Sequence, residues 1–472
     1  MKKMKYIISA LVAFALTMTS CEGFLDITPD GQAKRDPLLE TEQGIEDAMY
    51  GVYSQMRSTT LYGQELHFSA LEVMAHNLYC NGHKLVTALG KFDYANTDVK
   101  SLFSSVWTSM YKNISNVNSI LDAPKVANAK EYPFTIYRGE ALGMRAFMHF
   151  DLVRLFAEQY TVNPAAKGIP YATEFSLKAP EFESLKDNYE HILDDLLEAD
   201  SLLANEEKHA DERAFMLDRQ IHFNKYAVKA TLARVYLTMG DKKNAAKYAK
   251  EVIEKSGYVL KEKTEVKNDV AGVLSKKECV FGIYHSSFYT QVYAKLQQTT
   301  TRYSLNLRND YLATYEKDNS GLDFRTTAYF TTVPLGNEQI DRLSKLTEIY
   351  ELQNIVATRP ADLILGINMI RIPEMYYIMA EALLEDAPEK ALEYYNNVRE
   401  HRGLEKLGDD VTFTLNHINE ERYKEYIGEG QLFFNMKRLN LPIKSFDGTI
   451  EYKPENGIYV IPVPDSETEN RY

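Results

Sequence analysis

Aromatic side chains stand beside planar polar side chains at several points of the chain, a combination that suits binding rather than bond-breaking chemistry. The candidates are Tyr62 with Gln64, Tyr79 with Asn81, and further along the chain Tyr289, Tyr303, Asn306 and Arg308. A tyrosine ring packs against an apolar ring face, while amide and guanidinium groups hydrogen-bond to hydroxyls. These positions are therefore candidate contacts for a polar ring such as a pyranose, although for any single tyrosine core packing is the commoner role.

Trp107, the one tryptophan of the chain, begins a second aromatic pattern. Tyr111, Ile114 and Asn118 follow it at helical spacing. This spacing fits core packing and ligand stacking about equally, so Trp107 is a candidate ligand contact with both roles left open.

Groups that could catalyse a reaction or hold a metal do not form a recognisable pattern. The sequence has no HExxH, GxSxG, Walker lysine loop or GxGxxG motif. Cys80 and His83 make one Cys-x-x-His pair, which lacks the two further ligands of a closed zinc site. Residues 316–321 resemble the start of a calcium loop, but Thr327 stands where that loop needs a bidentate Glu. We therefore expect no enzymatic activity, no cofactor and no metal.

Two helical hairpins are the clearest elements that could position such residues. Residues 222–258 contain two apolar stripes of helical period joined at Gly240-Asp241, and their alanines allow close approach. The hairpin has about the length of one tetratricopeptide repeat, roughly 34 residues. A second hairpin is predicted at 370–403, with Pro388 at the start of its second helix and Gly403 as its C-cap.

The rest of the chain divides into further helices and long insertions. Helices are predicted at 41–57, 101–121, 135–158, 187–204 and 415–429. Insertions are predicted at 58–100, 159–181, 257–365 and 431–472, with β-like pieces at 278–285 and 457–464. We expect a mainly α scaffold around 41–57, 101–158, 187–256 and 370–430. Because long irregular segments in folded proteins are usually functional or disordered, and these are aromatic-rich, we expect the ligand side in 58–100, 257–365 and 431–472.

The N-terminus has the pattern of an export signal. Three lysines precede the apolar run from Ile7 to Leu16, which is too short to span a bilayer. Cys21 follows small polar residues, as in a bacterial lipoprotein signal, so we expect residues 1–20 to be removed and Cys21 to carry lipid. Simple secretory cleavage before a chance cysteine is the alternative. Residues 21–472 are then expected to form a single domain.

Amino-acid composition and net charge exclude several further classes of protein and of partner. The chain has 472 residues, 45% hydrophobic and 26% charged, which is ordinary for a globular protein and excludes both a disordered chain and a polytopic membrane protein. Its formal net charge of −13 makes nucleic acid an unsuitable partner.

Six segments, in order along the chain, resemble the SusD/RagB family of outer-membrane nutrient-binding lipoproteins of Bacteroidetes. They are CEGFLDITPDGQ (21–32), YRGEALGMRAFMHFDLVRLFAEQY (137–160), RIPEMYYIMAEALL (371–384), YYNNVREHRGL (394–404), INEERYKEYIGEGQLFFNMKRLN (418–440) and YVIPVPDSETENR (459–471). Trp107 and its helical pattern also resemble the family. The chain departs from the family pattern at Ala157, where Gly is usual, at Leu432, where Arg is usual, and at Asn435, where Asp is usual.

The resemblance implies more than the residues alone do. It implies about eight helices in four tetratricopeptide-like pairs, no enzymatic activity, and a lipid-anchored position on the cell surface at the outer membrane. It also implies a SusC-like TonB-dependent transporter as partner, for which the protein serves as lid and captures a glycan. Contact with the membrane would be through the N-terminal lipid only.

Two other functions remain open at this point. A RagB-like lid for a peptide or glycopeptide would use the same fold and anchor, and a single Trp makes a broad polysaccharide platform less obvious. A tetratricopeptide-type adaptor would instead present a bare concave helical groove to a protein partner.

Overall fold

The computed structural model of the chain is mainly helical, and its strands are short. It describes residues 35–262, 265, 273–296, 304–308, 310–316, 323–335, 337–345, 363–408 and 410–469. The α-helices are α2 (Arg35–Leu39), α3 (Glu42–Met56), α4 (Ala70–Met74), α5 (Lys84–Gly90), α6 (Thr97–Leu121), α7 (Pro124–Ala127), α8 (Phe134–Phe156), α9 (Leu185–Leu202), α10 (Lys225–Met239), α11 (Lys242–Lys255), α13 (Phe288–Leu296), α14 (Tyr311–Glu316), α15 (Arg325–Ala328), α17 (Ile372–Leu383), α18 (Pro388–His401), α19 (Leu415–Tyr426), α20 (Gln431–Arg438), α21 (Asn456–Tyr459) and α22 (Asp465–Glu469).

Short 3₁₀ helices and strands connect these helices. The 3₁₀ helices are η2 (Glu206–His209), η3 (Ala214–Met216) and η4 (Arg219–Ile221). The strands are β1 (Leu78–Tyr79), β2 (Lys167–Pro170), β3 (Phe182–Ser184), β4 (Val273–Ser275), β5 (Cys279–Tyr284), β6 (Asn306–Leu307), β7 (Phe330–Leu335), β8 (Glu338–Leu343), β9 (Leu363–Arg371), β10 (Ile443–Lys444) and β11 (Glu451–Tyr452). They form the antiparallel sheets β1-β6, β2-β3, β4-β9-β5, β7-β8 and β10-β11.

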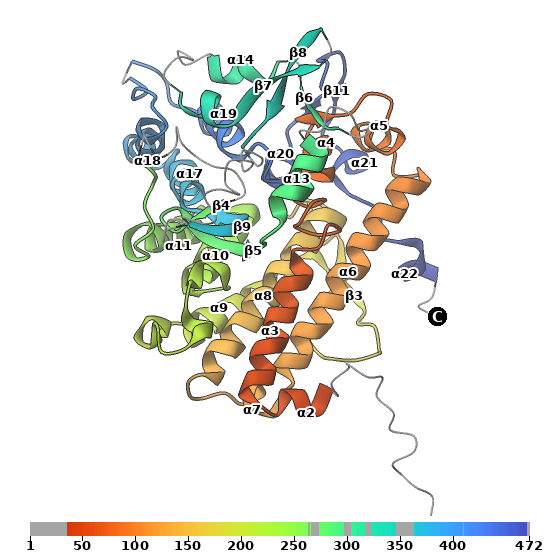
Figure 1. Cartoon of the computed structure of the whole chain (residues 1–472), viewed down its shortest axis with the longest axis vertical. Helices are drawn as coiled ribbons and strands as arrows, with labels where there is room; N and C mark the ends of the chain where they lie inside the picture. The colour runs from red at the N-terminus through yellow and green to blue at the C-terminus, as the bar shows by residue number, and fades with distance from the viewer. Residues whose placement is uncertain are drawn as a thin grey trace, which may run out of the picture.

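The longer helices of the described chain pack in four pairs, α3 with α6, α8 with α9, α10 with α11 and α17 with α18 (Figure 1). Capping residues set their boundaries. Asn96 begins α6 and Asn224 begins α10, and each side-chain oxygen accepts hydrogen bonds from first-turn N–H groups. α10 ends at Gly240 with φ 81°, and Asp241 caps α11. The expected mainly α fold and the joint at Gly240-Asp241 are confirmed.

The two clear hairpins stack on each other although about 110 residues separate them in sequence. α11 packs against α17, and the alanines Ala227, Ala230, Ala233, Ala245 and Ala249 of the first hairpin are fully buried. The intervening segment returns through β9, the central strand of the β4-β9-β5 sheet, which runs directly into α17. The insertion therefore leaves the helical stack and rejoins it without breaking the packing of the pairs.

Three local expectations need correction. The helix expected at 415–429 ends at Tyr426, and α20 begins at Gln431 after a turn in which Gly428 and Gly430 take positive φ. The stretch 431–472 therefore starts with a helix rather than with irregular chain. The β-like piece expected at 457–464 is wrong, because α21 covers its start and the following residues form no strand. The piece at 278–285 is confirmed as β5.

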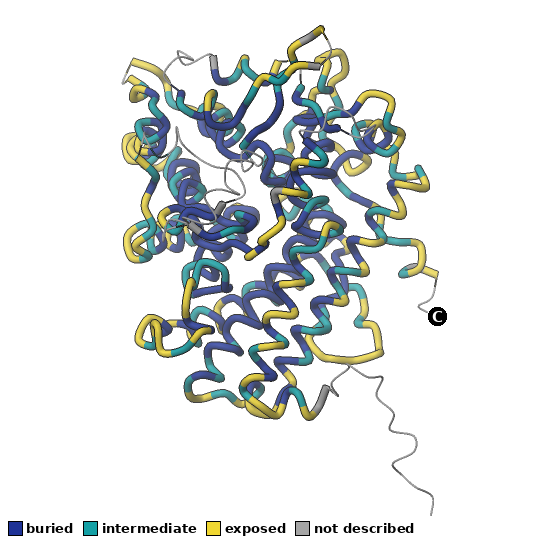
Figure 2. The backbone as a smooth tube through the Cα atoms, viewed as in Figure 1, coloured by how far each residue is buried: buried dark blue, intermediate teal, exposed yellow. Residues whose placement is uncertain are grey.

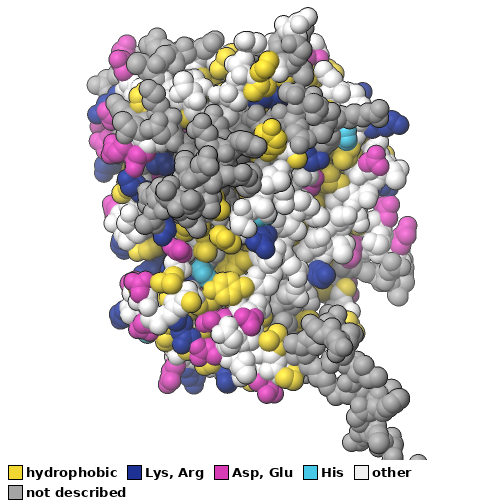
Figure 3. Space-filling view, in the orientation of Figure 1, with side chains coloured by type: hydrophobic (Ala, Val, Ile, Leu, Met, Phe, Trp, Pro, Cys, Tyr) yellow, Lys and Arg dark blue, Asp and Glu magenta, His cyan; other side chains and the backbone are white. Residues whose placement is uncertain are grey.

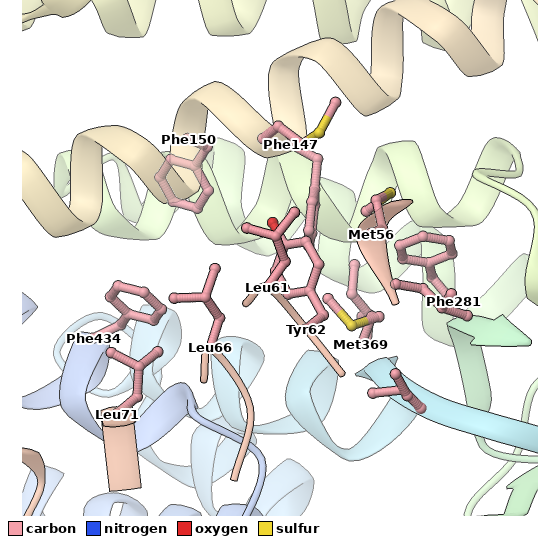
Figure 4. Close-up of a cluster of buried hydrophobic side chains, with 14 of the residues drawn as sticks. Met56, Leu61, Tyr62, Leu66, Leu71, Phe147, Phe150, Phe281, Met369 and Phe434 are labelled. Atoms are coloured by element: carbon pink, nitrogen blue, oxygen red, sulfur yellow. The ribbon is translucent and has the colours of Figure 1, made fainter. Parts of the chain in front are cut away.

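One hydrophobic core joins the helical pairs to the insertions. α8 is buried along nearly its whole length, because α3, α6, α9 and α10 pack around it (Figure 2). In Figure 4, Phe147 of α8 lies on the side of Phe281 of β5, with ring centroids 5.9 Å apart, and Phe150 lies on the side of Phe434 of α20. Residues from every quarter of the sequence thus share this core, which fixes the insertions on the helical scaffold.

Candidate functional site

Strands β1 and β6 bring together residues from two predicted insertions. Their antiparallel register sets Leu78 opposite Leu307 and Tyr79 opposite Asn306. The backbone N–H of Arg308 continues the contact by donating to the carbonyl oxygen of Asn77 at 3.0 Å. Tyr79, Asn306 and Arg308, three of the predicted ligand contacts, therefore lie at one place, and Asn81 is exposed two residues beyond Tyr79.

A third insertion adds an aromatic ring to this place. Phe446, in the turn between β10 and β11, stacks on Tyr79 with ring centroids 4.4 Å apart and planes 4° apart. His76 stacks against Phe446 at 6.2 Å and against Tyr452 of β11 at 5.4 Å. We call Tyr79, Phe446, His76 and Tyr452 the aromatic stack. Tyr79, Phe446 and Tyr452 are partly exposed whereas His76 is buried, and an exposed aromatic ring can pack against a sugar ring.

Polar groups border the aromatic stack. The Nδ2 of Asn306 donates to the carbonyl oxygen of Ser304 at 3.3 Å, and its Oδ1 accepts from Arg342. Arg308 pairs with the exposed Asp310 through both its Nε and its Nη2, the latter at 2.9 Å from Oδ2. The hydrogen bonds from Arg308 lower the pKa of Asp310, so the carboxylate is ionised at neutral pH. The site thus presents charged donors and acceptors in fixed directions.

His76 belongs to the stack as a neutral ring. Burial is the main cause that lowers the pKa of His76 to about 4. Its Nδ1 accepts a hydrogen bond from the backbone N–H of Phe446 at 3.2 Å, which requires that nitrogen to be unprotonated. His76 therefore holds the β10-β11 turn in place rather than supplying a charge.

The buried Glu72 of α4 connects the site to the scaffold. Its carboxylate accepts hydrogen bonds from the backbone N–H of Gly430 at 2.9 Å and from the side chain of Asn77 at 2.8 Å. Asn77 in turn holds Arg308, as described above. Burial raises the pKa of Glu72 to about 7. The start of α20, the residue before β1 and the segment after β6 are therefore fixed to one another.

Trp107 lies elsewhere, beside a separate cavity. Its ring is 2% exposed and packs against Tyr111 of the same helix and against Phe156 of α8. Its edge lines a cavity of about 420 Å³, together with Tyr111, Tyr171 and the loop 173–181. Core packing dominates for Trp107, and the structure gives it only a small surface to offer to a ligand.

The remaining predicted contacts divide between the core and the undescribed chain. Tyr62 is 2% exposed and donates its hydroxyl to Asp151 Oδ2 at 2.7 Å, so its ring and its polar tip are both committed within the core. The side chain of Tyr289 on α13, and Tyr303 and Cys21 as wholes, lie outside the described residues, as does the predicted signal segment 1–20.

Sequence reasoning missed Phe446, His76, Tyr452 and Asp310. Phe446 and Tyr452 fall in the insertion 431–472, which was expected to face the ligand without any named residue. His76 precedes β1 by two residues and carries no pattern. The signal that could have found Phe446 is its aromatic ring in a Ser-Phe-Asp-Gly turn, since such a turn exposes its side chain.

Among the described residues no cluster of three or more His, Cys, Asp or Glu side chains could hold a metal ion. Helices long and apolar enough to cross a membrane are likewise lacking in the described ranges. Exposed tyrosines such as Tyr50 and Tyr284 also occur away from the aromatic stack. Figure 3 shows hydrophobic side chains grouped among charged ones on one face of the molecule. The site differs from these other exposed side chains because residues from three insertions meet there.

The fold is a stack of tetratricopeptide-like helical pairs, and three of its insertions meet at the aromatic stack. A family model described as "Starch-binding associating with outer membrane" matches residues 23–237. A model of the SusD family matches residues 218–470, more than half of the chain. The chain therefore belongs to the SusD family, which confirms the resemblance seen in the sequence.

Individual relatives agree over nearly the whole chain. SusD-like protein P2 of Formosa agariphila is 24% identical over 515 residues, which cover 99% of this chain and 97% of the relative. A SusD superfamily protein from Bacteroides thetaiotaomicron has a TM-score of 0.71 at 24% identity, covering 91% of this chain and 97% of that one. A structure described as a laminarin binding SusD-like protein has a TM-score of 0.66 at 18% identity, with 91% and 98% covered. At these identities the solved structures establish the fold.

Proposed function

We propose that this protein is a cell-surface lipoprotein that captures a glycan through the aromatic stack and the polar groups beside it. The observation that carries the proposal is the junction of Tyr79, Asn306 and Phe446, contributed by three insertions that lie far apart in sequence. A scaffold that brings such segments to one place fixes them before the ligand arrives, which reduces the ordering cost of binding. The site holds no recognisable nucleophile and base pair, so capture without turnover is the proposed activity.

The ligand class follows from the chemistry of the site and has support from the family. A pyranose offers an apolar face to Tyr79 or Tyr452, and its hydroxyls match the donors of Arg308 and the acceptors of Asp310. One family model is described as starch-binding, and one structural neighbour as laminarin binding. We therefore favour an oligosaccharide over a peptide.

The proposed setting is the outer membrane, with a SusC-like TonB-dependent transporter as partner. Membership of the SusD family supports this setting, as does the family description that names association with the outer membrane. Lipid on Cys21 would tether the protein, and stable anchoring needs more than one acyl chain. The protein would then act as a lid that passes captured glycan to the transporter.

Calorimetry of the chain beginning after Cys21 tests the proposal, with a panel of α- and β-glucans, other polysaccharides and peptide digests. We expect heat with one glycan class. Phe446→Ala and Arg308→Ala should each weaken that binding about tenfold, because a lost ring or charged contact costs about 1–1.5 kcal/mol. Tyr284→Ala is the matched control, since this tyrosine is 43% exposed but has no ring contact with the stack.

The outcomes separate the alternatives. Heat from peptides alone would replace the glycan with a peptide ligand at the same fold. Binding that survives both site variants but fails in Trp107→Ala would move the site to the 420 Å³ cavity. Release of reducing sugar from any glycan would contradict capture without turnover.

A further inference from the structure

Four arginines surround a small cavity at the junction of the helical pairs, well apart from the aromatic stack. The cavity measures about 60 Å³. Arg154 of α8, Arg234 of α10, Arg422 of α19 and Arg438 of α20 line it, each from a different helix. The balance between these guanidinium groups and the carboxylates that pair with them decides whether the cavity carries a net charge.

Two of these arginines each have one carboxylate. Arg234 forms a two-point pair with Glu374 of α17, at 2.7 Å from Nε and 2.6 Å from Nη2. Arg154 donates through Nη2 to Asp151, one turn earlier on α8. These two ion pairs are buried and balanced in charge.

The other two arginines share a single carboxylate. Arg438 donates to both oxygens of Glu381 at 2.6 and 2.8 Å, and Arg422 donates to the same group. The cluster therefore contains four guanidinium groups and three carboxylates. Each guanidinium group has a carboxylate partner, but the four groups carry one positive charge more than the three carboxylates balance, and an uncompensated buried charge is costly.

Three buried donors at this cavity also have no acceptor in the described chain: the Nε of Arg154, the Nη1 of Arg234 and the hydroxyl of Tyr426. These residues are 7%, 5% and 5% exposed, and all three line the cavity. Guanidinium groups can only donate hydrogen bonds, and the tyrosine hydroxyl has a free proton. The group that completes these hydrogen bonds must therefore be an acceptor. The excess of positive charge around the cavity favours an acceptor with a negative charge.

We propose that this arginine cavity binds one small inorganic monoanion of the size of chloride. A volume of about 60 Å³ has room for an ion of that size but not for a large organic anion such as gluconate, since one water in the liquid takes about 30 Å³. Water alone would satisfy the donors but would leave the extra positive charge. The anion would bridge the helices of the N-terminal half, α8 and α10, to α19 and α20.

Two of the chain's three departures from the family pattern fall at this cavity. Leu432 and Asn435, where Arg and Asp are usual, both line it. Asn435 accepts a hydrogen bond from Arg438 Nη2 at 2.7 Å, in a position where a carboxylate would supply a fixed negative charge. Because Leu432 also lacks the positive charge of an Arg, the two departures together leave the net charge of the cavity unchanged, and the need for an anion rests on the excess of guanidinium groups described above.

Thermal unfolding of the chain beginning after Cys21 tests the anion site. Sodium chloride is exchanged stepwise for sodium gluconate at constant ionic strength, because gluconate is too large for the cavity. We expect the Tm to rise saturably by about 1–3 °C with chloride, since ligands of the native state stabilise it. A Tm that depends on ionic strength alone would overturn the proposal.

Asn435→Asp makes the test specific. This nearly isosteric change supplies the negative charge, so the Tm in gluconate should rise towards the chloride value and the response to chloride should fall several-fold. Asn456→Asp, at an exposed position on α21, controls for net charge and should keep the wild-type response. In crystals soaked in bromide, an anomalous peak is expected between Arg154 and Arg234. An unchanged chloride response in Asn435→Asp, or an empty cavity in bromide, would contradict the proposal.

Discussion

At the scale of single residues, Glu425 of α19 stands out among the described carboxylates because three arginines donate hydrogen bonds to it. Its carboxylate is fully buried and accepts from Arg402 at 2.8 and 2.9 Å, from Arg371 at 2.6 Å and from Arg325 at 3.3 Å. Burial opposes ionisation, but these arginines together hold the pKa of Glu425 well below its usual range. Such a group fixes the direction of α19 relative to β9 and α18.

Glu425→Gln should therefore destabilise the protein strongly. The amide keeps the shape but removes the charge that three buried guanidinium groups share, and breaking a buried pair in this way costs about 3–5 kcal/mol. Urea unfolding followed by circular dichroism measures the change. Glu393→Gln, at an exposed position on α18, is the control and should stay within about 0.5 kcal/mol of wild type. Equal effects of the two substitutions would show that the buried network adds no stability.

At the scale of elements, the junction between α19 and α20 leaves no room for a side chain at Gly430. Gly430 has φ +70°, and a Cβ built there would lie 2.4 Å from the carbonyl oxygen of Leu66 and 2.8 Å from that of His67. Its N–H also donates to Glu72, which connects this junction to Asn77 and the segment before β1. The glycine at 430 thus has a direct steric reason.

Gly430→Ala should lower the free energy of unfolding by about 2 kcal/mol or more, because both the left-handed backbone and the backbone contacts resist a methyl group. The comparison is Gly51→Ala in the exposed middle of α3, where nothing lies within 4 Å. That change should stabilise the protein by about 0.5–1 kcal/mol, since Ala is the better helix former. The opposite signs make the pair a stringent test, and a neutral Gly430→Ala would refute the steric account.

The same scale shows what sequence could and could not predict. The hairpin at 222–258 was readable because its alanine stripes, Asn224 and Gly240 are local signals. The pairing of Tyr79 with Asn306 joins strands of two residues each, 227 positions apart, and so short a strand leaves no periodic pattern. Phe446 reaches Tyr79 only through the packing of the whole C-terminal segment. The helical pairs were thus predictable from local signals, whereas for the site the sequence indicated Tyr79, Asn306 and Arg308 but not their contacts or the rings that stack on Tyr79.

For the molecule as a whole, buried charge decides how stability depends on pH. Although burial opposes it, arginine partners lower the pKa of several carboxylates: Glu140, Glu381, Glu421, Glu425 and Glu429. For Glu381, the charges of Arg422 and Arg438 bring the pKa to about 2. Each such group binds its proton more weakly in the folded than in the unfolded chain, where a Glu titrates near 4.3. Their stabilising effect is therefore present above that value and is lost as the pH falls towards 2.

Acid should thus unfold the protein by removing these carboxylate charges, and Glu381 offers a direct check. Wild type should lose stability steadily from pH 6 to pH 3.5, measured by urea unfolding at each pH. At pH 6, Glu381→Gln should be less stable than wild type by about 3 kcal/mol. At pH 3.5 this difference should be smaller by about 1.5 kcal/mol, because the variant has no carboxylate at this position to protonate. The two curves then converge as the pH falls. Parallel curves would mean that Glu381 contributes through packing rather than through its charge.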